Sequence, residues 1–288
     1  MLLEVHSIES KRAYAADTFI FLRWLEEQQL ELSQVDYDTL LLYREYLLDT
    51  WSQSTAKRRI AALRQFFTVA LRHGLITTNH AKDIKIKTHA DESSPHTALS
   101  KSEAKKLLAS VDRATLIGKR DYALLMLLIF GGVRRSECAH ITLADITSKQ
   151  EHKVLTIQHG KGNKRRDIPL RPDVFRAIYS YLESVDRLDD SPDSSLFTGF
   201  TSGYHATDQG ISSKTVEHVV KRYAAIIGMK ITPHDLRASA ITFWSDTNAP
   251  LIMVQRLAGH SSPVTTERYV SRKANLDNSP VYKVDLDA

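Results

Sequence analysis

The sequence lacks the features of a secreted or membrane protein. It contains a single cysteine, Cys138, which excludes an internal disulfide and is typical of a protein from a reducing compartment. Its first ten residues include Glu4 and Glu9 and no long apolar run, so they do not form a secretory signal. The most apolar segment, residues 123–130, is far too short to cross a bilayer. We therefore expect a cytoplasmic protein with no membrane partner.

Motifs of metal- and nucleotide-dependent enzymes are missing as well. The sequence contains no Walker-type glycine loop, no HExxH pair and no acidic cluster with metal-ligand spacing. The lone Cys138 is better explained by packing than by nucleophilic chemistry. A metal-dependent nuclease or a cysteine phosphatase is therefore not expected.

What is present is the composition of a soluble globular protein, with 42% hydrophobic and 25% charged residues. A chain of 288 residues is long for one hydrophobic core, so we expect two domains. The net charge of +5 is unevenly spread. Residues 1–50 carry four basic and ten acidic side chains, whereas residues 51–90 carry eight basic side chains and one acidic.

This excess of positive charge falls largely on a predicted helix. Its basic side chains are suited to contact the phosphate backbone of duplex DNA: Lys57, Arg58, Arg59, Arg64 and Arg72. A solvated face without a partner is the alternative interpretation.

The first part of the chain has the pattern of a helical domain. Apolar periodicity predicts a helix over residues 7–29, a second after an N-cap at Asp36, and a third after an N-cap at Ser54 that ends at Gly74. The side chains expected in its core are Phe19, Leu22, Trp24, Leu25, Leu30, Leu40, Leu41, Tyr43, Leu47, Leu48, Ile60, Leu63, Phe67 and Leu71. Residues 84–98 then have the composition of a linker.

A capping box at Ser100 and Glu103 opens the second domain. Residues 120–130 are apolar on nearly all faces, which predicts the central helix of this domain. The predicted boundaries are 1–86 for the first domain, 87–98 for the linker, 99–272 for the second domain and 273–288 for a tail.

Two glycines follow the central helix and allow a sharp corner that aims Arg134 inward. Pairing of Arg134 or Arg135 with Glu137 on a surface is the alternative.

Alternating residues 154–158 and 166–170 then predict two strands joined by a hairpin turn with Lys161 at its tip. From this tip Lys161 can reach a substrate, while Lys164 and Arg165 are suited to contact DNA. A solvated basic turn is the alternative. We expect a helix from Pro172 to about residue 188, a polar loop over 189–210, and a helix from an N-cap at Ser212 to Ile227.

The next helix is signalled by an N-cap at Thr232, Pro233 in its first position and Asp235 in an approximate capping box. His234 and Arg237 are three residues apart and share one face, in the turn where free N–H groups favour an anion.

A further helix over 250–258 should stop at Gly259, and His260 and Tyr269 follow. Helix capping and ordinary half-buried packing are the alternatives for these two side chains.

Taken together, four segments resemble the motifs of tyrosine recombinases of the phage-integrase and Xer type: GGVRRSE (131–137), GKGNKRRDIPL (160–170), TPHDLRASA (232–240) and LAGHSSPVTTERY (257–269). The chain departs from the usual pattern in its Gly-Gly-Val-Arg, in Arg135 where an aliphatic residue is usual, and in Ala238 and Ser271, where histidine is frequent. None of these departures removes a catalytic position.

The resemblance implies a mainly α fold with a small β-sheet, in which a helical core-binding (SAM-like) domain and a catalytic domain form a C-shaped clamp on duplex DNA. It implies that Tyr269 is the nucleophile, Arg134 and Arg237 clamp the phosphate, Lys161 is the general acid, and His234 and His260 assist. Neither a metal ion nor an organic cofactor should be required.

The resemblance further implies a homo-tetramer on two DNA sites, assembled from monomers, that exchanges strands in pairs through a Holliday junction. The need for accessory proteins stays open. The tail could dock on its own or a neighbouring subunit, or be disordered. A type IB topoisomerase-like activity and a catalytically silent DNA-binding regulator are the alternative functions.

Overall fold

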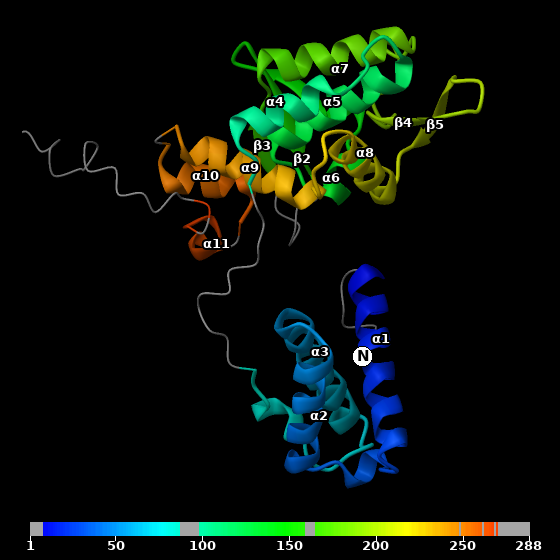
Figure 1. The fold of residues 1–288 in the computed structure, drawn as a ribbon, viewed down its shortest axis with the longest axis vertical. Helices are drawn as coiled ribbons and strands as arrows, with labels where there is room; N and C mark the ends of the chain where they lie inside the picture. The colour runs from blue at the N-terminus through cyan, green and yellow to red at the C-terminus, as the bar shows by residue number, and fades with distance from the viewer. Residues whose placement is uncertain are drawn as a thin grey trace, which may run out of the picture. The chain divides into compact units, whose positions relative to one another are not determined.

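The computed structural model describes residues 8–86, 98–158, 165–247, 249–260, 262–267 and 269, and the chain divides into two compact units, residues 1–93 and 94–288 (Figure 1). No helix within these described ranges is long and apolar enough to cross a membrane. The predicted tail over 273–288, and all of the predicted linker over 87–98 except Ala98, lie outside them. The domain boundaries therefore stay predictions.

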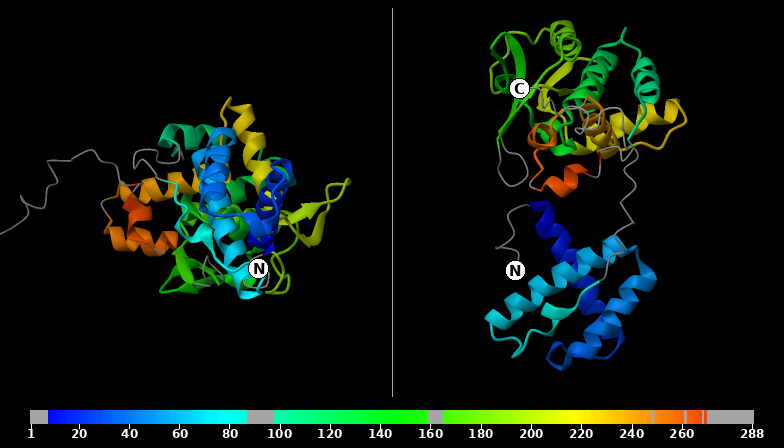
Figure 2. Two further views of the ribbon diagram at one scale, coloured as in Figure 1. Left: turned by 90° about the horizontal axis from the view of Figure 1, so that it is seen from below. Right: turned by 90° about the vertical axis from the view of Figure 1, so that its left-hand side faces the viewer.

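The described part of the first unit is built on three long helices, α1 (Ile8–Glu27), α2 (Tyr37–Thr50) and α3 (Gln53–Arg72). Two short 3-10 helices accompany them, η2 (Leu32–Gln34) and η3 (His80–Asp83). Figure 2 shows the long helices of this unit packed together. They enclose one core, in which the rings of Phe21 and Tyr43 meet edge-on with 4.9 Å between centroids.

Local signals in this unit are mostly confirmed. Asp36 accepts the N–H of Thr39 at the start of α2, and Gly74 adopts a left-handed φ of 70° after α3. The predicted cap at Ser54 is wrong, because Ser52 accepts the N–H of Thr55 and begins α3 two residues earlier.

Three side chains expected in this core are exposed instead. Phe19, Leu22 and Leu71 are 65%, 41% and 42% exposed. On α1 the buried apolar side chains include Phe21, Trp24 and Leu25, so this helix has apolar residues on two faces and buries those of one face.

The second unit is organised around α5 (Leu116–Gly131), the buried helix predicted over residues 120–130. Four helices contact it: α4 (Lys101–Ala109), α7 (Pro172–Ser184), α8 (Ser213–Ile226) and α9 (Pro233–Ser245). The predicted caps of α4, α8 and α9 at Ser100, Ser212 and Thr232 are confirmed. Shorter helices complete the described part of the unit: α6 (Arg135–His140), η4 (Leu143–Asp145), α10 (Leu251–Ala258) and α11 (Pro263–Glu267).

Two small antiparallel sheets lie in the same unit. One has the order β1-β2-β3, with β1 (Ile146–Lys149), β2 (His152–Ile157) and β3 (Arg166–Pro169). The pairing of β2 with β3 confirms the predicted strands and places Ile157 opposite Arg166. The other sheet, β4 (Thr198–Phe200) with β5 (Ala206–Gly210), lies where a loop was expected.

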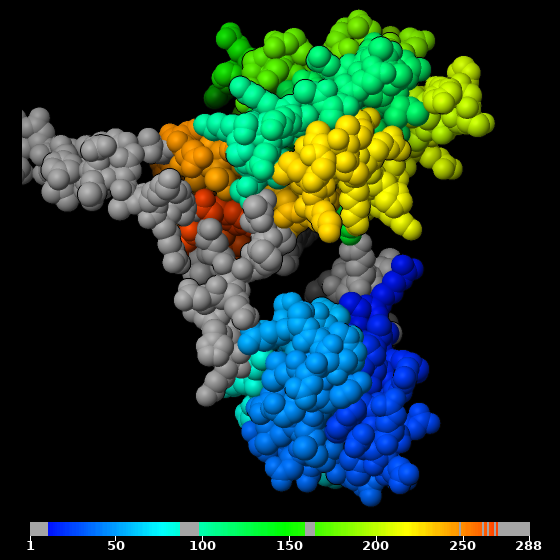
Figure 3. All heavy atoms as spheres, viewed as in Figure 1, coloured from blue at the N-terminus to red at the C-terminus, as the bar shows by residue number. Residues whose placement is uncertain are grey.

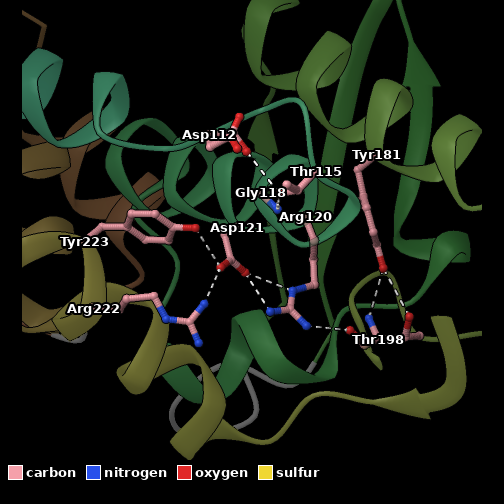
Figure 4. Close-up of polar contacts among 9 residues, drawn as sticks. All are labelled: Asp112, Thr115, Gly118, Arg120, Asp121, Tyr181, Thr198, Arg222 and Tyr223. Carbon is pink, nitrogen blue, oxygen red and sulfur yellow. Dashed lines mark hydrogen bonds and ion pairs between the residues drawn. The ribbon is translucent and has the colours of Figure 1, made fainter. Parts of the chain in front are cut away.

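A buried polar network ties the central helix to its surroundings (Figure 4). Asp121 of α5 is fully buried and accepts hydrogen bonds from Arg120, at 2.7 and 2.9 Å, and from the Tyr223 hydroxyl of α8, at 3.1 Å. Arg120 also donates to the carbonyl of Thr198 in β4, and the hydroxyl of Tyr181 on α7 lies 3.1 Å from the Thr198 hydroxyl. The Arg120–Asp121 ion pair thus links α5 to α8 and to the second sheet. The Tyr181 hydroxyl links α7 to the same sheet. The mainly helical fold with small sheets is confirmed.

Candidate active site

The site is built on the carboxyl end of α10, a helix that lies at the surface of the second unit (Figure 3). Gly259 ends this helix with a left-handed φ of 62°, as predicted. The carbonyls of its last two residues and of the capping Gly259 each accept a hydrogen bond from a different arginine: Leu257 from Arg166 at 3.0 Å, Ala258 from Arg237, and Gly259 from Arg134 at 3.1 Å. The negative end of the helix dipole and three carbonyl groups therefore gather three guanidinium groups.

Arg134 reaches the carboxyl end of α10 because α5 ends in a tight corner. Gly132 has a left-handed φ of 57°, and an added Cβ would lie 2.6 Å from the ring of Trp244 on α9. Glycine is therefore needed both for the backbone conformation and for the close approach of α9. The corner inferred from the two glycines is present.

Glu137 forms the anionic part of the site. Its carboxylate accepts from the Arg134 side chain at 2.7 Å and from Arg166 in a two-bond pair at 2.6 and 3.0 Å. Burial alone would raise the pKa of Glu137, but the hydrogen bonds and charge of Arg166 lower it to about 2. The pairing of Arg134 with Glu137 considered as an alternative is present, with the carboxylate buried and Arg134 half-buried, while Arg135 pairs with Glu217 on α8.

Sequence reasoning missed Glu137 and Arg166 as site residues. A signal for Arg166 existed, because strand alternation places it on the same face of β3 as Ile168, and both are buried. A buried arginine requires an anionic partner. For Glu137 the signal was its spacing of three residues from Arg134, and the pair considered on that ground is present.

Arg237 is the most deeply buried arginine of the cluster, 2% exposed, and donates to the carbonyls of Gly132 and Ala258. Burial, followed by the charge of Arg134, lowers its pKa to about 9, so it stays protonated at neutral pH. The two arginines predicted to act together are therefore side by side.

His260 and Tyr269 lie next to this cluster. Their rings stack at 6.0 Å between centroids, and Nδ1 of His260 is 2.9 Å from the Thr266 hydroxyl. Tyr269 packs against the small cluster of Ile241, Val254 and Ala258, close enough to Arg237 that a phenolate there would raise the pKa of this arginine. The structure thus places the predicted nucleophile beside the arginines.

The remaining predicted residues are distributed as follows. His234 lies exposed in the first turn of α9, close enough for its charge to act on His260. Lys161 and Lys164 lie outside the described residues, whereas Arg165 is exposed at the start of β3. Cys138 is buried in the core of the unit, and burial raises the pKa of its thiol, as expected for a packing role.

Basic residues of α3 were predicted to contact DNA, and for Arg59 the structure contradicts this prediction. Its side chain is buried, with its guanidinium 3.6 Å from the ring centroid of Trp51 and 3.5 Å from the carboxylate of Asp17 on α1. It therefore stabilises the helix packing and is not free to contact DNA. Four others are exposed or half-exposed: Lys57, Arg58, Arg64 and Arg72.

The lowered pKa of His260 should make the stability of the folded protein depend on pH. Burial, helped by the charges of Arg237 and Arg134, lowers its pKa to about 4, against about 6.5 in an unfolded chain. Between these values the unfolded state binds the extra proton, so stability falls as pH drops from 6.5 towards 4 and is unaffected by this group above pH 7.

Because the His260 ring is partly solvated, its charge interactions are screened, and the stability lost at pH 5 should be about 1 kcal/mol. Thermal unfolding of the DNA-free protein at pH 7.5 and pH 5 should show a smaller drop in melting temperature for His260→Asn than for the parent. Equal drops would contradict the assignment.

Comparisons with known proteins show which family the chain resembles along most of its length. Residues 97–275 match the model described as phage integrase family, and residues 2–74 match the phage integrase N-terminal SAM-like domain. The chain is 30% identical over 261 residues to tyrosine recombinase XerD of Lacticaseibacillus casei, covering 89% of this chain and 85% of that protein. It is 32% identical over 273 residues to tyrosine recombinase XerC of Listeria welshimeri, covering 92% and 87%.

Solved structures share the fold. XerH site-specific recombinase bound to a palindromic difH substrate superposes with a TM-score of 0.77 at 19% identity, over 96% of this chain and 81% of that one. A lambda integrase dimer bound to a COC' core site superposes with a TM-score of 0.68 at 17% identity, over 94% and 92%.

Proposed function

The chain belongs to the phage integrase family of tyrosine recombinases and cleaves and rejoins DNA at recombination sites, and we propose that the arginine cluster at the end of α10 is its active centre. One observation carries this proposal. The guanidinium groups of Arg134 and Arg237 meet at the end of the helix that leads to the stacked rings of His260 and Tyr269.

The arrangement suits transfer at a phosphodiester. Negative charge grows on the two non-bridging oxygens as the transition state forms, and a planar guanidinium can donate two hydrogen bonds to such a group. Arg134 and Arg237 would supply this stabilisation from a fixed, largely buried position, where it is worth more than in water. The arginines thereby provide positive charge that a metal ion supplies in many other phosphoryl-transfer enzymes.

In the proposed reaction, Oη of Tyr269 attacks the scissile phosphorus, the bond from phosphorus to O5′ breaks, and a 3′-phosphotyrosyl link forms. The leaving O5′ takes a proton from Lys161. His234 receives the tyrosine proton and supports the phosphate. Attack by the 5′-hydroxyl of a partner strand reverses these steps and rejoins the DNA, so the covalent link conserves the bond energy.

His260 would act as a neutral hydrogen-bond donor. Its lowered pKa keeps the ring uncharged at neutral pH. In the tautomer whose Nδ1 accepts a hydrogen bond from the Thr266 hydroxyl, the ring proton lies on Nε2, from which it would be donated to a non-bridging oxygen.

DNA contacts outside the centre would come mainly from α3. Lys57, Arg58, Arg64 and Arg72 would bind the phosphate backbone, with Lys164 and Arg165 doing so near the centre. We further propose that four cytoplasmic protomers act on two sites and exchange strands in pairs through a Holliday junction, each protomer being a monomer before it binds. The lambda integrase structure holds a dimer on one core site, which supports two protomers per site.

The tail over 273–288 would dock on its own or a neighbouring subunit. A cavity of about 560 Å³ between β3 and α10 supports this, because Ile252 and Met253 give it apolar walls and Arg165 and Arg256 give it positive charge, and its lining extends past Asp167 to His260. The tail sequence Val-Asp-Leu-Asp at 284–287 alternates apolar and acidic side chains that would match such a surface.

The proposal is tested by trapping the intermediate. The protein is incubated with a nicked duplex whose short 5′-hydroxyl fragment diffuses away after cleavage, so the covalent adduct accumulates. Proteolysis and mass spectrometry should then find one nucleotide-bearing peptide, with the DNA 3′-phosphate on Tyr269. An adduct at another residue, or at a 5′-phosphate, would reject the assigned centre.

A further inference from the structure

The buried face of α1 carries an acidic side chain. Asp17 lies one helical turn before Phe21 and two turns before Trp24, and all three are buried, with Asp17 only 4% exposed. A buried carboxylate costs free energy unless cationic or hydrogen-bonding groups surround it. Asp17 therefore depends on the helix that packs against α1, which is α3.

Two neighbouring arginines of α3 pair with this one carboxylate. Oδ1 of Asp17 lies 3.5 Å from Nε of Arg59, and Oδ2 accepts a hydrogen bond from Nη1 of Arg58. Successive side chains on a helix point about 100° apart, so the two arginines leave α3 in different directions. The side chain of Arg59 is 9% exposed, whereas that of Arg58 is 46% exposed. One buried anion thus contacts a buried arginine and a surface arginine.

This pairing leaves Arg58 able to bind a second anion. Its hydrogen bond to Asp17 uses Nη1, and a guanidinium has five N–H donors. Burial raises the pKa of Asp17, and the charges of Arg58 and Arg59 oppose this rise, so both arginines act on the same carboxylate. Because helix packing and Arg59 hold Asp17 in place, its bond to Arg58 restricts the directions in which that long side chain can point.

We propose that Asp17 is a positioning residue for DNA binding, which holds the Arg58 guanidinium at the surface of α3 in the orientation that receives a backbone phosphate. This inference rests on the proposed contact of α3 with DNA. Replacing Asp17 should weaken DNA binding although it removes a negative charge, because Arg58 must then be immobilised when the DNA binds. Charge repulsion alone predicts the opposite sign, since losing a carboxylate would strengthen binding to a polyanion.

A double-mutant cycle on the full chain tests the inference. A mixed-sequence duplex is the probe, because phosphate contacts do not depend on sequence. Asp17→Asn should weaken binding by about 2- to 12-fold, the factor expected for immobilising one long side chain. Arg58→Gln should weaken binding and reduce the slope of log K against log salt concentration by about 0.9. In the Arg58→Gln background, Asp17→Asn should have no further effect.

Two results would overturn the inference. One is an affinity of Asp17→Asn equal to or above that of the parent. The other is an equal loss of affinity from Asp17→Asn with and without Arg58, because the carboxylate would then act through the fold of the unit.

A second variant separates positioning from stability. Asp17→Asn leaves Arg59 buried without its counter-charge and should lower the melting temperature. Combining it with Arg59→Gln removes both buried charges and should regain most of that loss. The DNA affinity of this combination should stay as low as that of Asp17→Asn, and recovery of affinity together with melting temperature would contradict the positioning role.

Lys57→Gln supplies the matched background. Lys57 precedes Arg58 on α3 and takes no part in the ion pairs of Asp17, so Asp17→Asn should weaken binding in this background as much as in the parent. Failure of the proposed DNA contact would appear separately. Arg58→Gln would then leave both the affinity and the salt slope unchanged, and the inference would be rejected with the contact.

Discussion

We expect the Tyr269→Phe variant to bind a recombination site with parental affinity and to form no covalent adduct. The substitution removes one oxygen atom and keeps the ring, which packs against Ile241, Val254 and Ala258 and stacks on His260. Folding and DNA contacts should therefore persist. Loss of a covalent nucleophile typically reduces turnover by on the order of 10⁴- to 10⁶-fold, because the covalent route is closed.

The measurement pairs a DNA-binding assay with denaturing electrophoresis of the nicked-duplex reaction. Tyr204→Phe is the matched control, since Tyr204 is 65% exposed in the turn between β4 and β5, and its adduct yield should equal that of the parent. A parental yield from Tyr269→Phe would mean that another side chain attacks the phosphate.

The second large effect concerns stability. Asp121→Asn should destabilise the second unit by about 3–5 kcal/mol, because it leaves the guanidinium of Arg120 buried without a full counter-charge. The Tyr223 hydroxyl, whose pKa is raised to about 12 by burial and then by Asp121, would also lose its carboxylate acceptor. Since domains are commonly stable by only about 5–15 kcal/mol, such a loss should be evident at 37 °C.

Urea denaturation followed by circular dichroism checks this expectation. Glu217→Gln serves for comparison, because Glu217 pairs with Lys221 and Arg135 near the surface of α8, and exposed pairs contribute about 0–1 kcal/mol each. A loss below about 1 kcal/mol for Asp121→Asn would show that the remaining partners compensate for the missing charge.

Much of the second unit follows from signals that act over a few residues. The caps at Ser100, Ser212 and Thr232 and the left-handed glycines Gly132 and Gly259 were all predictable, because a cap or a positive φ depends on adjacent chemistry. The order of Arg134, Arg237, His260 and Tyr269 was likewise readable in the four motifs. The part each of these residues plays in the reaction stays a prediction.

The predictions that failed depend on contacts between residues that are far apart in the sequence. Phe19 and Leu71 have the chemistry of core residues, and only the packing partners of α1 and α3 decide that they are exposed. The strands β4 and β5 were taken for a loop because they are short, and because β4 is held by distant groups such as Arg120 and Tyr181.

The pair of Glu137 and Arg166 was missed for the same reason. These residues lie 29 positions apart, so no local pattern announces their contact. Tertiary structure alone brings them together.

The carbonyls at the carboxyl end of α10 determine which kinds of mutation this helix tolerates. They belong to the backbone, so replacing an exposed side chain such as Ile252 or Met253 cannot delete them. An inserted or deleted residue is different, because it would turn the helix end by about 100° and carry all three acceptors away together. This short helix should accept many substitutions along its outer face and no change in its length.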